Sequence, residues 1–101
     1  MNKQDSLTRE LNRLDEYEQA ALTAILRELR IARRLHPEWR DDLVYGSAII
    51  SEEAGDLTRE CLRFEDECTD RSKASECFDR ICEEAAQVGA MGLRFLSNVI
   101  R

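Results

Sequence analysis

The chain has 101 residues, a length that fits a single domain. Hydrophobic residues make up 43% and charged residues 36%, so the composition excludes an intrinsically disordered chain. The formal net charge of −6 argues against a nucleic-acid polymer or an anionic membrane surface as partner. No apolar run approaches the roughly 20 residues that span a bilayer. The segment "MNKQDSLTRE" lacks the apolar core of a signal peptide, so we expect a cytoplasmic protein without a membrane partner.

A first helix is predicted over residues 6–35. Leu, Ala, Glu and Arg dominate the composition and favour helix, and Asp5 or Ser6 can cap the first turn. The helix should end before Pro37, because the residue that precedes a proline avoids helical backbone angles. Its apolar stripe recurs every three or four residues, as one buried helix face requires: Leu7, Leu11, Leu14, Ala21, Ile25, Leu29 and Ala32.

Two further helices are predicted over residues 42–68 and 73–100, separated by the polar segment "TDRS". Asp41 or Asp42 can cap the first of them. The fold class is therefore all-α, with three long helices in a bundle with short connections. Because the apolar stripes are wide for so short a chain, we expect a second chain to complete the core.

The four cysteines do not form the close ligand pairs of a zinc site. They are Cys61, Cys68, Cys77 and Cys82, and no Cys-x-x-Cys spacing occurs among them. In a reducing compartment they are interpreted as free thiols. A disulfide between the last two helices would need an oxidising compartment, and the sequence does not decide between these alternatives.

The last two helices carry one sequence plan twice. The segment "ISEEAGDLTRECLRF" begins at Ile50, and "ICEEAAQVGAMGLRF" begins at Ile81. In each segment two polar side chains, three residues apart, lie on one flank of the apolar stripe, roughly 60° and 120° from it. These pairs are Glu53 with Asp56 and Glu84 with Gln87. If the two stripes pack together, both flanks can line one edge of the helix interface.

Carboxylates that crowd a half-buried edge repel one another, and a bound cation is the usual compensation. Oxygen ligands of this type select Mg²⁺, or Mn²⁺, over softer metals. Gly55, Gly89 and Gly92 are costly inside a helix and indicate close approach of a helix or a ligand. Acid pairs at this spacing are also common on solvated helix faces. On that alternative reading the chain is a helical interaction module and the acids are only surface.

The segment "EEAGDL", which contains Glu53 and Asp56, resembles a family signature. It is similar to the Glu-Glu-x-Gly-Glu-Leu signature of the all-α nucleoside triphosphate pyrophosphohydrolases, the MazG-like superfamily. The family motif is Glu-x-x-Glu on one helix and Glu-x-x-Asp on the next. Here Asp56 replaces the second Glu, and Gln87 replaces the Asp. The resemblance covers about residues 35–96 and is to the small stand-alone members from phage and bacterial genomes.

The resemblance implies a homodimer or tetramer with a MazG-like helical bundle completed by oligomerisation. It implies hydrolysis of a (deoxy)nucleoside triphosphate to the monophosphate and pyrophosphate. The Mg²⁺ ligands would be Glu53, Asp56, Glu84 and Gln87, with Glu53 and Glu84 as the catalytic carboxylates. Because Gln87 carries no charge and cannot act as a base, the alternative is a non-catalytic helical oligomer. Such an oligomer would bind a nucleotide or a protein around a degenerate metal site.

Three more residues are candidates for contact with the substrate. Trp39 could stack on a base, although anchoring an interface is the commoner role for such a tryptophan. Lys73 and Arg94 could contact phosphates, although most charged side chains on helices are solvated or paired.

Overall fold

The computed structural model describes residues 3–67 and 71–101. These residues form four helices and no strand: α1 (Lys3–Asn12), α2 (Glu16–Leu35), α3 (Leu43–Glu67) and α4 (Arg71–Ile100). The all-α prediction is confirmed. Cys68, the last residue of the predicted helix 42–68, lies outside the described residues. Among the described helices none combines the length and the apolar character that crossing a bilayer requires.

The prediction of one helix over residues 6–35 is wrong, because the chain breaks between α1 and α2. Asp15 caps α2, and its Oδ1 accepts a hydrogen bond from the backbone N–H of Glu18 at 2.7 Å. The Glu18 carboxylate in turn accepts from the backbone N–H of Asp15 at 3.0 Å. This reciprocal capping box satisfies two backbone donors at the start of a helix. It stabilises a new helix at Glu16 although the leucine spacing continues through the break.

The last residue of α2 and the cap of α3 agree with the sequence prediction. The backbone N–H of His36 donates to the Ala32 carbonyl at 2.8 Å, which closes the last turn of α2 before Pro37. Asp42 caps α3, because its Oδ1 accepts from the backbone N–H groups of Val44 at 3.0 Å and Tyr45 at 3.2 Å. The connection between the two helices is therefore fixed by hydrogen bonds at both of its ends.

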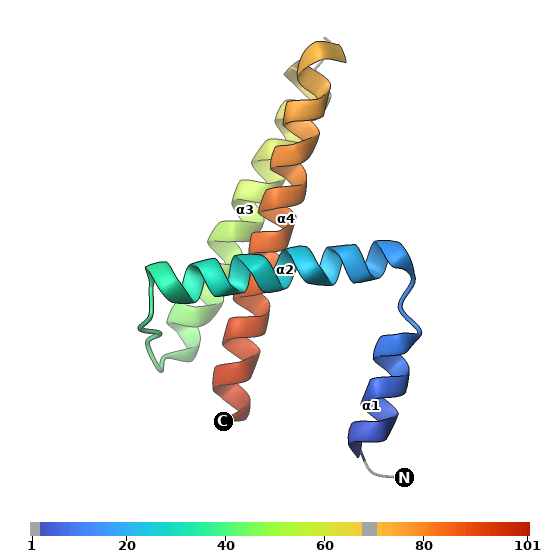
Figure 1. Cartoon of the computed structure of the whole chain (residues 1–101). Helices are drawn as coiled ribbons and strands as arrows, with labels where there is room; N and C mark the ends of the chain where they lie inside the picture. Colours follow the sequence, from blue (N-terminus) through green and yellow to red (C-terminus); the bar gives the residue numbers. More distant parts are fainter. Residues whose placement is uncertain (1–2, 68–70) are drawn as a thin grey trace.

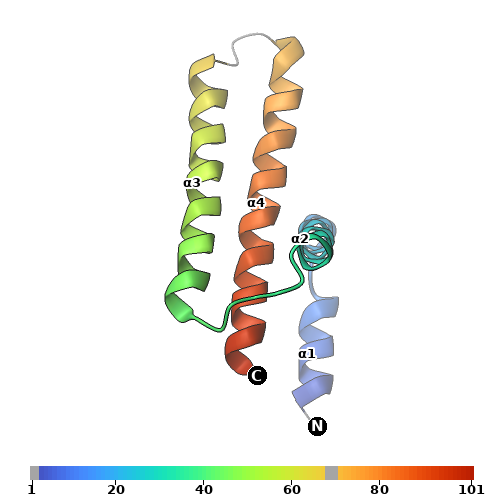
Figure 2. The same cartoon turned by 90° about the vertical axis from the view of Figure 1, so that its left-hand side faces the viewer.

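Two helix contacts build the structure. Helices α3 and α4 run antiparallel along their length, and α2 crosses α4 steeply on another side (Figures 1 and 2). The crossing is close at Gly89, where a Cβ would lie 2.8 Å from Cδ1 of Ile25. The close approach expected at Gly89 is thus confirmed. Around Gly55 and Gly92, by contrast, a Cβ would meet nothing within 4 Å.

Little of the chain is buried. Leu29, Ala86, Ala90 and Arg94 are buried, while large apolar side chains on every helix are exposed. The accessible surface is 8095 Å², against about 5,900 Å² expected for a compact monomer of this mass. The radius of gyration is 16.2 Å, against about 13 Å for a compact domain of this length. Within one chain, the helices therefore leave much apolar surface uncovered.

The cysteines differ in state among the described residues. Cys61 and Cys82 are free, as the sequence analysis expected. Cys77 is disulfide-bonded, so the interpretation of all four cysteines as free thiols is wrong for this residue.

Candidate metal centre

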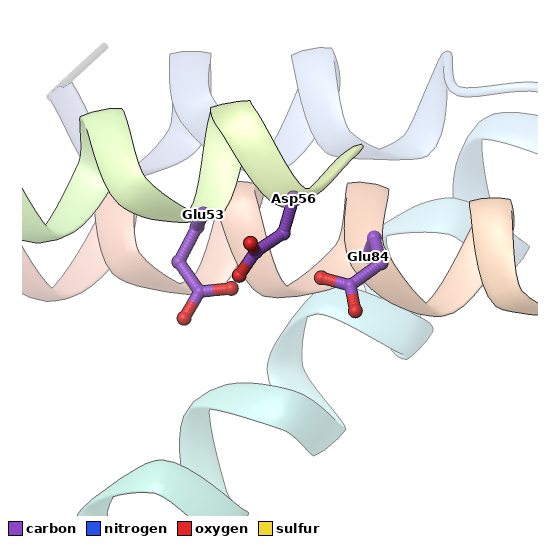
Figure 3. Close-up of side chains that lie close together, drawn as sticks. All are labelled: Glu53, Asp56 and Glu84. Atoms are coloured by element: carbon purple, nitrogen blue, oxygen red, sulfur yellow. The ribbon is translucent and has the colours of Figure 1, made fainter. Parts of the chain in front are cut away.

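Three carboxylates from two helices meet at one edge of the α3–α4 interface. Glu53 and Asp56 belong to α3 and Glu84 belongs to α4, and each offers one oxygen within 4.8 Å of the others. Figure 3 shows the three side chains reaching from neighbouring ribbons into the same space. All three residues are half-buried. The structure therefore brings together the three acids that the repeated segments single out.

The repeat explains why these side chains meet. Three-residue spacing places Glu53 and Asp56 on the same flank of α3. Glu84 holds the equivalent position on α4, because its segment aligns with that of Glu53. A two-fold axis perpendicular to an antiparallel helix pair keeps equivalent flanks on the same side of the pair. The antiparallel packing of α3 on α4 therefore joins the two acidic flanks along one edge.

Gln87 completes this edge as a neutral group. Its side-chain amide faces the carboxylates of Glu53 and Glu84. With the amide nitrogen toward them, it donates hydrogen bonds to Glu53 Oε2 at 3.1 Å and to Glu84 Oε2 at 3.2 Å. With the amide oxygen toward them, it would add a fourth oxygen donor to the group. An amide can turn between these orientations, so Gln87 suits the cluster both with and without a cation.

Burial and mutual repulsion raise the pKa of two of the acids. Desolvation is the larger cause at Glu53, followed by the charges of Glu84 and Asp56. Desolvation also leads at Glu84, followed by the charge of Asp56, and Arg59 partly opposes this rise in pKa. Arg59 itself pairs with Asp56 at 3.1 Å on the exposed side of α3. The cluster therefore holds more negative charge than its protein surroundings neutralise.

A cavity of about 450 Å³ adjoins the cluster. Glu53 and Gln87 line it together with Trp39 and Arg94, which lie about two helical turns further along the site. The rest of its wall comes mainly from apolar or aromatic side chains of α2, α3 and α4: Ile31, Ala32, Leu35, Tyr45, Ile49, Ala90 and Met91. This volume lies within the range of small-molecule sites.

Arg94 is the charged residue that is buried most completely among the described residues. Its guanidinium donates to the carbonyl oxygens of Ala32, at 3.4 Å, and of His36. It also lies over the Trp39 ring, 4.9 Å from the centroid. Burial, followed by the charge of Arg33, lowers the pKa of Arg94. Its donors therefore serve the carboxyl end of α2, and they fix that helix and Trp39 against α4.

Of the three candidates for substrate contact, the structure brings two together. Trp39 and Arg94 touch and line the same cavity. Lys73 is exposed near the start of α4, eleven residues before Glu84 and so about 16 Å away along the helix. It does not line the cavity.

Glu28 is a residue of this site that no motif of the sequence indicates. It lies on α2, is half-buried, and lines the cavity with Glu53. Its charge also contributes to the raised pKa of Glu53. In the sequence Glu28 belongs to a charged run that is typical of a solvated face. Only its place beside Leu29 on the buried stripe could have indicated it, and only once the crossing of α2 over α4 is known.

No protein-family model, curated protein or solved structure matches this chain. The chemistry of the site therefore rests on its own geometry. Gathered carboxylate oxygens, an amide and a neighbouring apolar cavity suit a hard divalent cation and an organic ligand that carries anionic groups.

Proposed function

We propose that the chain is a Mg²⁺-dependent nucleotide pyrophosphohydrolase, which cleaves a (deoxy)nucleoside triphosphate to the monophosphate and pyrophosphate. One observation carries the proposal: three carboxylates lie within 4.8 Å of one another, and one of them lines a cavity of about 450 Å³ with an aromatic wall. The motif resemblance of "EEAGDL" agrees with it. Mg²⁺ is the proposed cation, with Mn²⁺ as a substitute.

The proposed ligands are oxygens of Glu53, Asp56, Glu84 and Gln87. A divalent cation bound there would neutralise phosphate charge and lower the pKa of a bound water. Burial and neighbouring acids raise the pKa values of Glu53 and Glu84. A carboxylate with a raised pKa is a better proton acceptor near neutral pH. Either glutamate, where it is not fully engaged as a ligand, can therefore orient the attacking water and take its proton.

The cavity is the proposed site for the nucleoside part of the substrate. Trp39 and Tyr45 offer aromatic surface to a base, and Met91 and Ile49 offer apolar contact. Glu28, which faces this space from α2, can accept hydrogen bonds from sugar or base. Arg94, which also lines the cavity, supports this wall by holding Trp39 and the end of α2.

The proposed enzyme is a homodimer or tetramer, as the resemblance implies. The uncovered apolar surface supports this part of the proposal, because a chain with so few buried side chains gains stability from a partner.

A second candidate is a nucleotide-binding or protein-binding oligomer without turnover, and Gln87 favours it. At this position a carboxylate would add charge to the ligand set, whereas an amide adds only a neutral oxygen. A centre with one charge fewer binds a cation more weakly and holds fewer ions.

The test is pyrophosphate release with Mg²⁺ from a panel of nucleoside and deoxynucleoside triphosphates. We expect release from at least one of them by the wild type, and a loss of at least about 100-fold in Glu53→Gln. Glu52→Gln is the matched control, because Glu52 is an exposed neighbour on the same helix and should leave the rate nearly unchanged.

Thermal unfolding with and without Mg²⁺ separates the alternatives. No release, together with Mg²⁺-dependent stabilisation that Glu53→Gln abolishes, would replace the enzyme by the binding oligomer. If neither release nor stabilisation occurs, the acids are surface groups of an interaction module.

A further inference from the structure

Helix α1 packs on none of the other described helices of its own chain. In the described residues, α4 packs on α3 and α2, while α1 contacts none of these helices. Figures 1 and 2 both show α1 connected to the start of α2 and separated from the α3–α4 pair. A helix of ten residues is marginal in water even when its sequence favours helix. A surface on which α1 packs would therefore stabilise it.

The sequence of α1 is that of a docked helix. Leu7 and Leu11 are four residues apart and share one face, and their residues are 56% and 47% exposed. Arg9 lies on the opposite face. Such an amphipathic helix buries its apolar face against a partner.

The last turns of α4 offer a surface of matching character. Leu96, Val99 and Ile100 are all more than half exposed. A Cβ at Gly92, one turn earlier, would meet nothing, so the backbone there can be approached closely. The stretch from Gly92 to Ile100 is about 13 Å long, and α1 is about 15 Å long. Both lie on the same side of α2, yet they do not touch (Figure 1).

The amount of uncovered surface points to a second copy as the occupant. The chain exposes about 2,200 Å² more than a compact monomer of its mass. If each of two chains buries that much, the interface totals about 4,400 Å², well above the roughly 1,000 Å² that a specific interface needs. A two-fold interface buries the same excess surface on both chains. The apolar face of α1 and the apolar end of α4 belong to the same chain but do not touch. In a two-fold dimer, each α1 could therefore pack on the α4 of the other chain.

We propose that α1 is an exchanged arm: in a two-fold dimer, its Leu7 face packs on the Leu96–Ile100 region of the partner's α4. The proposal rests on the association part of the proposed function and needs no hydrolysis. Because α1 contacts no other helix of its own chain, its loss should leave the α3–α4 pair and the acidic centre folded.

The test is sedimentation velocity across a range of concentrations, with the double variant Leu7→Asp and Leu11→Asp. We expect a dimer for the wild type, and a dissociation constant at least about 100-fold higher for the variant, because two buried leucines are replaced by charges. Arg9→Asp is the matched control and should remain a dimer. Helical content and Mg²⁺-dependent stabilisation, measured on the same samples, show whether the rest of the chain is still folded.

Hydrogen exchange of the backbone amides of α1 supplies a second measurement that needs no variant. We expect protection that falls as the wild type is diluted below its dissociation constant, while α3 and α4 stay protected. A wild type that is monomeric at tens of micromolar would overturn the proposal. So would a double variant that still dimerises, or α1 protection that is independent of concentration, since α1 would then pack on its own chain. If the wild type forms the dimer but hydrolyses no nucleotide, the proposed enzymatic function is wrong and the proposed exchange of α1 still stands.

Discussion

Glu53 and Glu84 are half-buried carboxylates with other acids close by. Their pKa values are raised in the fold, so the folded chain holds protons more tightly than the unfolded chain does. The stability that this contributes is fully present below the unfolded value, near 4.5. It is lost as the pH rises through the raised pKa values. Without divalent cations, we expect the free energy of unfolding of the wild type to fall over this window relative to Glu53→Gln.

Urea unfolding of both proteins in a chelating buffer, from pH 4 to pH 8, measures this difference. Added Mg²⁺ should restore the wild type only toward the upper end of the range, because protons compete with the cation for the same oxygens. Parallel pH curves for the two proteins would mean that folding does not raise the pKa of Glu53.

Arg94 and Arg63 occupy the same place in the two copies of the repeat and have different surroundings. Arg94 is buried over Trp39 and bonded to carbonyls at the end of α2. Arg63 is half exposed and pairs with Glu60 at 3.1 Å. Arg94→Ala should lower the free energy of unfolding by about 3 kcal/mol, because a buried side chain is lost and two carbonyls at the end of α2 lose a charged donor. Arg63→Ala should change it by less than about 1 kcal/mol, as for other exposed ion pairs.

Chemical denaturation at one protein concentration compares the two variants, with Arg94→Lys as a third. Lysine keeps the charge and loses the planar fork, so it should recover only part of the stability. Equal effects of the two alanine variants would contradict the assignment of Arg94 to the anchor between α2 and α4.

At the scale of elements, the crossing of α2 over α4 depends on the absence of a side chain. A Cβ at Gly89 would lie 2.8 Å from Cδ1 and 2.9 Å from Cγ1 of Ile25. The clash opposes the gain of about 1 kcal/mol that alanine offers inside a helix. We therefore expect Gly89→Ala to destabilise by about 1 kcal/mol. Gly55→Ala, where a Cβ meets nothing within 4 Å, should stabilise by about 1 kcal/mol.

Thermal unfolding of the two variants gives the signs directly. Ile25→Val removes Cδ1, so combining it with Gly89→Ala should relieve part of the clash. A stabilising Gly89→Ala would show that α2 moves away from α4 without loss, and that the crossing is loosely held.

The placement of side chains on each helix could be predicted from the sequence, whereas the crossing of α2 over α4 could not. Three-residue spacing beside an apolar stripe is enough to gather Glu53, Asp56 and Glu84, because both helices present the same flank. Hydrophobic spacing does not predict the break before α2, because the leucine spacing runs through it in phase; the signal for the break is the Asp15–Glu18 capping box. The role of Glu28 depends on how α2 crosses the other helices, which is a tertiary contact without a sequence period.

At the scale of the whole molecule, α2, α3 and α4 pack together around the site, and α1 packs on none of them. The α3–α4 pair carries the acids, α2 closes the cavity beside them, and α1 stands apart. Hydrophobic spacing predicts that each stripe is buried. It does not say whether the covering surface belongs to the same chain, which is why wide stripes predicted a partner without locating it.

The acidic edge also couples the stability of the fold to the preorganisation of the proposed cation site. Its carboxylates come within 4.8 Å when α3 packs on α4, so their repulsion is incurred during folding and not when a cation arrives. If a cation binds there as proposed, its ligand oxygens are already gathered, and little of its affinity would be lost in arranging them. Any substitution that relieves the repulsion should raise the free energy of unfolding and weaken cation binding at the proposed site. Selection for a more stable chain and selection for a tighter metal centre would therefore favour opposite changes at these three positions.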